Sequence, residues 1–193
     1  LKLFTEEKVQ HVLVSYASVK GRADIRLPFA DVIMDSGAYS VETGNAAVNI
    51  GAYTMWLQLY LKDYPQIKHY VNLDDLSDPE KSLWNLRYME NEGLNPMPVY
   101  HYGEDLKYLD LFCERHEYVG LGGIAVGTIP VQNLENFWVM IHNTHPETKF
   151  HIFGVGTMTP FFRHLPYSLD CTSWNVVARF GDILVYKFGV PCR

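Results

Sequence analysis

The sequence is poor in cysteine, has no long apolar run and carries no excess of basic residues. Its three cysteines are odd in number, far apart and without C-x-x-C spacing, which argues against a disulfide framework and for a reducing cytoplasm. No apolar stretch approaches the length of a membrane span, and no signal peptide is recognisable. We therefore expect a cytoplasmic protein with no membrane partner. Both ends look cut, because the chain begins at Leu1 rather than Met and stops at Arg193.

The charge balance limits how the chain could hold a nucleic acid. The 16 Lys and Arg residues stand against 22 Asp and Glu residues, which gives a formal net charge of −6. A protein that grips DNA or RNA by charge alone carries the opposite sign. A nucleic-acid partner would therefore need a local basic patch, another domain or a partner chain. The 13 tyrosines could stack on bases, but the more ordinary use of Tyr is to fill the core.

Short apolar runs alternate with helical patterns along the 193 residues, a length that suits one domain. Eight runs are apolar enough for strands buried on both faces, at residues 11–17, 31–35, 69–74, 97–102, 118–124, 149–155, 168–171 and 183–188. Amphipathic spacing and capping signals predict helices after Asn49, after a capping box at 77–80, and over 105–116, 130–143 and 173–180.

This repeated strand–helix order predicts parallel strands joined by right-handed crossovers. Eight such strands predict an α/β fold of the (β/α)8 TIM-barrel type. Because these barrels typically take about 250 residues, and because no helix is evident over 18–30, the barrel would be compact or incomplete. An open doubly wound α/β sheet is the alternative. Residues 1–193 are interpreted as a single catalytic domain.

Polar residues and glycines gather where the predicted strands end. Aspartate, histidine or paired glycines end six of them: Asp35, Asp74, His101, Gly122 with Gly123, Gly154 with Gly156, and Asp170. In a parallel barrel these ends converge on one face, and active sites lie on that face.

Each of these residues also has a plainer interpretation. An Asp after a strand usually caps the next helix, and Asp75 fits that role best. A glycine there usually lets the chain turn, and His101 alone is more often a hydrogen-bonding residue than a catalyst. The plainer interpretation leaves the recurrence of strand-terminal aspartate unexplained. Three carboxylates on one face repel one another and are tolerated where shifted pKa values are useful.

Several motifs resemble those of the tRNA-guanine transglycosylase family and occur in the family's order. Residues 35–40 (D-S-G-A-Y-S) are similar to its D-S-G-G-F-Q, and residues 121–127 (L-G-G-I-A-V-G) to its L-G-G-L-A-V-G. Residues 153–157 (F-G-V-G-T) resemble M-G-V-G-T, residues 169–171 (L-D-C) resemble F-D-C, and residues 73–75 (L-D-D) match F-D-E more weakly. The resemblance covers most of residues 11–186 and implies a purine base-exchange enzyme built on a barrel.

Members of this family exchange a guanine already present in a polynucleotide for a free 7-deazaguanine derivative. The match to F-D-C implies that Asp170 is the nucleophile that attacks C1′ of the sugar and forms a covalent glycosyl-enzyme. The match to D-S-G-G implies that Asp35 is the general acid and base, which assists departure of guanine and takes the N9 proton of the incoming base. The resemblance implies neither a cofactor nor a catalytic metal.

The resemblance also implies which residues hold the base. Asp74 would read the N1–H and amine edge of the purine, and Gly122, Gly123 and Ile124 would present backbone groups to it. His101 stands at the strand end where the family carries a base-reading Gln. The other implied contacts are Ser36, Gly154, Gly156 and Tyr39, the last replacing a family Phe as a surface on which the base stacks.

One departure from the family bears on the partner. Members that modify tRNA carry a zinc site of three closely spaced Cys and a His near the C-terminus, and this sequence has no such cluster. We therefore expect a barrel without the zinc subdomain. In this the chain is similar to shorter, phage-encoded relatives that act on DNA, for which the compartment is the host cytoplasm. DNA is favoured slightly over tRNA as the partner, and family members often pair as homodimers.

Two other functions fit the same residues. A hydrolase that cleaves an N-glycosidic bond, or a transferase that acts on small nucleosides, would suit the acidic charge and modest length. A non-catalytic module that binds deazapurines would keep the pocket without the reaction, although the presence of both Asp35 and Asp170 speaks against it.

Overall fold

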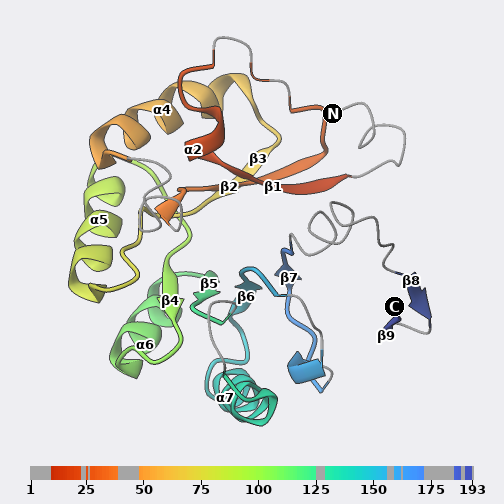
Figure 1. The fold of residues 1–193 in the computed structure, drawn as a ribbon. Coiled ribbons are helices and arrows are strands. Elements are labelled where there is room, and N and C mark those ends of the chain that lie inside the picture. The colour runs from red at the N-terminus through yellow and green to blue at the C-terminus, as the bar shows by residue number, and fades with distance from the viewer. Residues whose placement is uncertain are drawn as a thin grey trace.

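The structure is a computed structural model that describes residues 10–22, 25, 27–38, 48–124, 129–155, 159–161, 163–171, 185–187 and 190–192. Strands and helices alternate along the chain, and helices α4 to α7 lie around the outside of the strands (Figure 1). The elements are β1 (His11–Ser15), α2 (Tyr16–Val19), β2 (Asp31–Asp35), α4 (Ile50–Asp63), β3 (Ile67–Tyr70), α5 (Pro79–Asn91), β4 (Val99–His101), α6 (Leu106–Arg115), β5 (Tyr118–Gly122), α7 (Val131–Thr144), β6 (Lys149–Ile152), the 3₁₀ helix η1 (Thr159–Phe161), β7 (Ser168–Leu169), β8 (Val185–Lys187) and β9 (Val190–Cys192).

The strands pair in the order in which they occur in the sequence. Strands β1, β2 and β3 form one parallel sheet, β4 to β7 form another, and a parallel bridge between Val71 and Met97 joins the two. The expected α/β fold with parallel strands is therefore confirmed.

A complete eight-stranded barrel is not seen among the described residues. Within them, β1 pairs only with β2, and β7 pairs only with β6. The run at 183–188 was expected to supply an eighth parallel strand. Its described part, β8, instead pairs antiparallel with β9, so that expectation is wrong. The short segment between the two strands favours a hairpin, because a parallel neighbour needs a crossover of a dozen or more residues.

The helices are capped at or next to the residues that the sequence predicts. Asn49 caps α4, since its side chain accepts a hydrogen bond from the Ala52 N–H. The cap of α5 is Asp78 rather than Ser77, because Asp78 is the last extended residue and its carboxylate suits the positive end of the helix. The expected helix at 173–180 lies outside the described residues. Within the part of the chain that the structure describes, no helix is long and apolar enough to cross a membrane.

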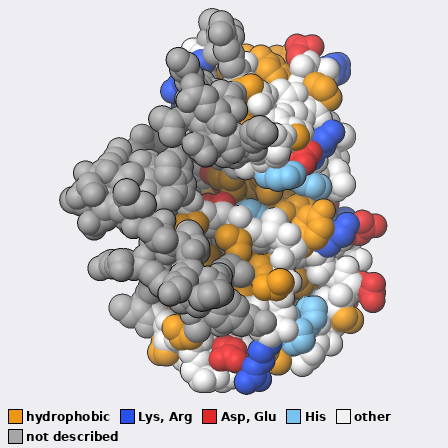
Figure 2. Space-filling view, turned by 90° about the vertical axis from the view of Figure 1, so that its right-hand side faces the viewer, with side chains coloured by type: hydrophobic (Ala, Val, Ile, Leu, Met, Phe, Trp, Pro, Cys, Tyr) orange, Lys and Arg blue, Asp and Glu red, His pale blue; other side chains and the backbone are white. Residues whose placement is uncertain are grey.

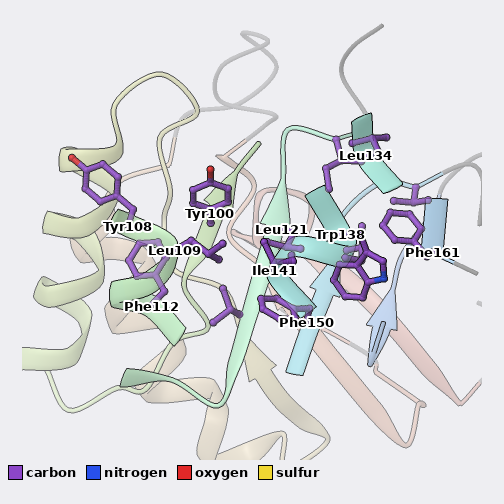
Figure 3. Packing of buried hydrophobic residues seen from close by; sticks show 14 of the residues in the cluster. Tyr100, Tyr108, Leu109, Phe112, Leu121, Leu134, Trp138, Ile141, Phe150 and Phe161 are labelled. Carbon is purple, nitrogen blue, oxygen red and sulfur yellow. The ribbon is translucent and has the colours of Figure 1, made fainter. Parts of the chain in front are cut away.

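Helices α6 and α7 cover the outer face of β4 to β6 and form the larger core. Trp138 of α7 lies across the Phe150 ring of β6, with ring centroids 5.7 Å apart, and also meets Phe161 (Figure 3). Leu121 and Phe112 are buried in the same cluster. Burial of each such side chain contributes about 1.5–3 kcal/mol, so this packing fixes the outer face of the strands.

A smaller apolar cluster fills the inner face and draws on both sheets. Its buried members are Val71, Met97, Val99 and Tyr118, with Ile33 and Phe153 packed against them. Residues of β2, β4 and β5 therefore share one interior, which holds the two sheets around a common side. The inner face is apolar toward the start of the strands and becomes polar at their carboxyl ends.

The turn after β2 depends on Gly37. Its φ is +87°, a left-handed conformation that favours glycine, and its N–H donates to the Asp35 carboxylate at 3.0 Å. A Cβ added at this position would lie 2.6 Å from the Cβ of Ala17 in the neighbouring turn. Gly37 is therefore required both for its backbone conformation and for the close approach of the two turns.

Replacing Gly37 with alanine should destabilise the protein more than the same change at Gly93. Both glycines have positive φ, but a Cβ at Gly93 would meet nothing within 4 Å. We expect Gly93→Ala to cost about 1 kcal/mol from backbone strain and Gly37→Ala about 1–3 kcal/mol more from overpacking. Urea unfolding of the two variants measures the difference. Equal losses would show that the contact with Ala17 is not tight.

Candidate active site

The strand register brings most of the expected site residues to one face. The pairing sets Ser15 opposite Asp35 and His101 opposite Gly122, and β7 enters the sheet with Ser168 opposite His151. Residues opposite each other in a parallel pair point to the same side of the sheet, and side chains alternate along each strand. Asp170, two residues after Ser168, therefore returns to the inner face at the carboxyl ends of the strands.

Asp35 is the most perturbed carboxyl group of this site. Burial, followed by the negative charge of Asp74, raises its pKa to about 7, and the charge of Asp170 makes the smallest contribution to the rise. The Gly37 N–H and the Ser15 hydroxyl oppose the shift, although the buried Ser15 Oγ makes no well-formed hydrogen bond. Asp35 therefore lies close enough to Asp74 and Asp170 for their charges to raise its pKa.

Asp74 is held by a buried histidine. His101 Nε2 lies 2.9 Å from Asp74 Oδ2, and His101 Nδ1 lies 3.1 Å from Glu104 Oε1. Burial disfavours charge on the ring, but the bonds to Asp74 and Glu104 outweigh it and raise the pKa of His101 to about 9. The imidazole is therefore charged at neutral pH with both nitrogens turned to carboxylates. In this arrangement His101 holds Asp74 and leaves no ring nitrogen for a ligand.

The remaining residues near Asp74 complete its surroundings. Ser36, which is fully buried, donates from Oγ to Asp74 Oδ1 at 3.3 Å and accepts from the Ala38 N–H. Glu104 was missed by the sequence analysis, although its position three residues after His101 is a spacing that allows contact across a tight turn. Ser36 therefore lies beside Asp74 and supports its carboxylate.

The expected glycines contribute to the site by leaving space for a neighbouring side chain and by turning the backbone. A Cβ at Gly122 would lie 2.6 Å from Cδ2 of His101, so the histidine occupies room that only glycine leaves. Gly123 has a φ of +71° and turns the chain beside Tyr102. The side chain of Ile124 is buried in the larger core, so only its backbone is available to the site.

Asp170 follows β7 and is partly exposed. The Gly154 N–H donates to its Oδ1 at 3.0 Å, and His151 Nε2 lies 3.3 Å from the same oxygen. The side chain of Asp170 is 22% exposed, whereas that of His151 is 2% exposed. Gly154 therefore acts on Asp170 through its backbone. His151 was missed by the sequence analysis, which treated residues 149–155 as an apolar strand.

A cleft opens beside Asp74, and neither Asp35 nor Asp170 is among its lining residues. It has a volume of about 420 Å³, and its lining includes Asp74, Trp84 and Asn85. Asp75 lies at its wall and is tied to Lys81 Nζ at 2.7 Å, a hydrogen bond that lowers the pKa of Asp75 to about 2. Asp75 thus accepts hydrogen bonds in the turn before α5, but the cap of that helix is Asp78, so the expectation that Asp75 caps it is wrong.

Two of the site residues that the sequence predicts are not described by the structure. Tyr39 and Gly156 lie outside the described part of the chain. Within that part, no group of three or more His, Cys, Asp or Glu side chains is arranged to hold a metal ion.

Comparison with known proteins supports the fold and indicates no activity. No family model and no curated protein matches the chain. Among solved structures, a protein from Aquifex aeolicus VF5 is similar over 92% of this chain and 89% of its own, with 11% identity and a TM-score of 0.50. At this identity the likeness shows the α/β fold alone.

The pKa of Asp35 predicts how stability depends on pH. A carboxyl group whose pKa rises from 3.8 to about 7 on folding stabilises the protein while protonated. That stability is complete below pH 3.8 and is lost as pH rises through 7. Asp35→Asn should remove this loss and make the variant more stable than wild type above pH 7, by up to about 4 kcal/mol.

Urea unfolding between pH 4 and pH 8 measures this effect. The control is Asp63→Asn, which removes an exposed carboxylate at the end of α4 and should leave the shape of the profile unchanged. A profile for Asp35→Asn that runs parallel to wild type would refute the assignment of a protonated Asp35.

The pKa of His101 predicts a second pH window. Because this pKa is about 9 in the folded protein against an ordinary value of 6.5, protonation stabilises the fold fully below pH 6.5. That stabilisation is lost as pH rises through 9. His101→Gln should abolish the decline and lower stability at pH 6 by about 3–5 kcal/mol, because two buried carboxylates lose their cation.

The matched control is His145→Gln, since His145 Nε2 also contacts an aspartate, Asp110, at 3.0 Å but on the surface. Unfolding free energies from pH 6 to pH 9.5 should decline as in wild type for this control. The His101 assignment fails if the His101→Gln profile declines equally.

Proposed function

We propose that this chain is a transglycosylase that exchanges guanine in a polynucleotide for a 7-deazaguanine derivative. The observation that carries the proposal is the contrast between two carboxyl groups that interact within one site. The pKa of Asp35 is raised to about 7, whereas Asp170 is partly exposed and accepts hydrogen bonds. Titratable groups whose surroundings differ in this way take different roles in acid–base and nucleophilic chemistry.

Asp35 would act as the general acid and base. A group with a pKa near 7 holds and releases a proton with equal ease at neutral pH, which is the condition for efficient proton transfer. In the first half-reaction Asp35 would protonate the departing guanine. In the second it would take the N9 proton of the incoming base.

Asp170 would act as the nucleophile. An oxygen of its carboxylate would form a bond to C1′ of the sugar while the bond from C1′ to N9 breaks, giving a covalent glycosyl-enzyme. The nitrogen of the incoming base would then displace the carboxylate and restore it. The same configuration of the sugar is kept because two displacements occur at one carbon.

Asp74 would read the donor edge of the purine. Hydrogen bonds from His101 and Ser36 hold its carboxylate in one orientation beside the cleft. The N1–H and amine groups of guanine and of 7-deazaguanines offer donors to such a carboxylate. Gly122 supports this arrangement, because the lack of a side chain there leaves the room that the His101 ring fills beside Asp74.

The proposal includes an incomplete barrel of the (β/α)8 type as the single catalytic domain of residues 1–193. Its support is the sequential order of seven parallel strands around one interior, without the reversal of order that defines doubly wound sheets. In such a barrel the carboxyl ends of the strands surround the substrate.

The net charge of −6 means that the whole chain does not attract a polynucleotide by charge. On the face that Figure 2 shows, acidic and basic side chains are interspersed over the described residues. A local basic patch elsewhere, another domain or a partner chain would therefore hold DNA or tRNA in the cytoplasm. Hydrolysis of an N-glycoside, or transfer between small nucleosides, would use the same two aspartates and is the alternative.

Mass spectrometry after incubation with DNA or tRNA and a 7-deazaguanine base tests the proposal. We expect exchange of guanine and a covalent adduct that survives denaturation. Asp170→Asn should abolish the adduct, because an amide is a poor nucleophile. Asp110→Asn is the matched control, since Asp110 also pairs with a histidine, His145, and this variant should keep full activity.

Three outcomes count against the proposal. Exchange by Asp170→Asn at the wild-type rate would refute the nucleophile. Release of free base without exchange would identify a hydrolase. Binding of the base without turnover on any polynucleotide would identify a binding module.

A further inference from the structure

A hydrogen-bonded row of side chains lies behind Asp170 on the inner face. Tyr118 Oη contacts Ser168 Oγ, Ser168 Oγ contacts His151 Nδ1, and His151 Nε2 lies 3.3 Å from Asp170 Oδ1. These residues come from β5, β6 and the end of β7, which are neighbours in one sheet. The row is therefore built by strand register rather than by flexible surface side chains.

The burial of this row determines which of its atoms carry protons. His151 is 1% exposed, and Tyr118 is 9% exposed, so water cannot freely replace their partners. A buried imidazole with both nitrogens in hydrogen bonds takes the tautomer that its two partners dictate. The partners of His151 differ in kind, since one is a carboxylate that only accepts and the other is a hydroxyl that can donate or accept.

With a neutral imidazole, one arrangement of protons satisfies every group in the row. The Asp170 carboxylate accepts, so His151 Nε2 carries the hydrogen and Nδ1 is bare. Nδ1 then accepts from the Ser168 hydroxyl, whose oxygen accepts from the Tyr118 hydroxyl. Tyr118 and Ser168 thereby fix the tautomer of His151 from the far side of the ring.

The hydrogen bonds to Asp170 in this arrangement end on one of its two oxygens. His151 Nε2 and the Gly154 N–H both contact Oδ1. Two donors on one oxygen fix the plane of the carboxylate and the direction in which Oδ2 points.

We infer that His151 is the positioning residue of Asp170, with its Nε2–H form set by Ser168 and Tyr118. This inference rests on the proposed function, in which Asp170 is the nucleophile. Oδ2 forms the bond to C1′ as the bond from C1′ to N9 breaks, and the electron pair leaves with the base that Asp35 protonates. His151 keeps its proton throughout and touches no reacting atom.

The first measurement needs no substrate. Imidazole ¹⁵N NMR of the full chain should show His151 as the neutral Nε2–H tautomer. In Ser168→Ala, which removes the donor to Nδ1, the signals should move toward a mixture of tautomers. Tyr118→Phe should produce a smaller shift in the same direction, and it changes one hydroxyl only. A wild-type His151 in the Nδ1–H or the charged form would overturn the inference.

The second measurement uses the exchange reaction. His151→Leu should lower the rate of adduct formation about ten- to hundredfold with KM little changed, the range for losing one hydrogen bond to a charged group. His151→Gln restores a donor near the position of Nε2 and should recover most of the rate. His145→Leu is the control, since it breaks a His–Asp pair on the surface and should leave the rate unchanged.

The two proposals fail in different ways. A wild-type protein that forms no adduct refutes the proposed function, and the NMR result then decides the placement of His151 alone. An active protein whose His151→Leu variant equals wild type, or whose His151→Gln variant is as slow as His151→Leu, refutes the positioning role. Thermal unfolding of each variant separates a loss of rate from a loss of fold.

Discussion

The site is organised by the repulsion among three carboxyl groups at the carboxyl end of one sheet face. Asp35, Asp74 and Asp170 cannot all be buried and charged without compensation, because burial strengthens like-charge repulsion. Each group meets this constraint differently. The pKa of Asp35 rises to about 7, Asp74 gains a charged His101, and Asp170 remains partly exposed with two donors on one oxygen. The chemical differences among three identical side chains follow from these surroundings.

The surroundings depend in turn on small residues at the strand ends. Gly122 leaves the space that the His101 ring fills, and Gly37 lets the turn after β2 approach Ala17 while directing its N–H at Asp35. Glycine here is a packing requirement as much as a conformational one. The apolar inner cluster beneath, with Val99 and Tyr118 among its buried members, holds the sheets at the curvature that makes this polar rim converge.

Two buried histidines hold aspartates, a role that the sequence motifs alone do not indicate. His101 binds two carboxylates, which makes it a support for Asp74 rather than a free contact for a base. His151 connects Asp170 to Ser168 and Tyr118. Asp74 and Asp170 are thus each held by a buried histidine, which orders their side chains within the fold itself.

The sequence by itself determined the alternation of strands and helices, the cap at Asn49 and the gathering of Asp35, Asp74 and Asp170 at strand ends. These features are local, since they depend on periodicity, turn residues and capping groups within a few positions. The partners of each carboxyl group were decided only by the tertiary structure. His151 reads as one residue of an apolar strand, and Glu104 as one residue of a turn. Their contacts arise from the register between strands and the approach of separate turns, which no local pattern encodes.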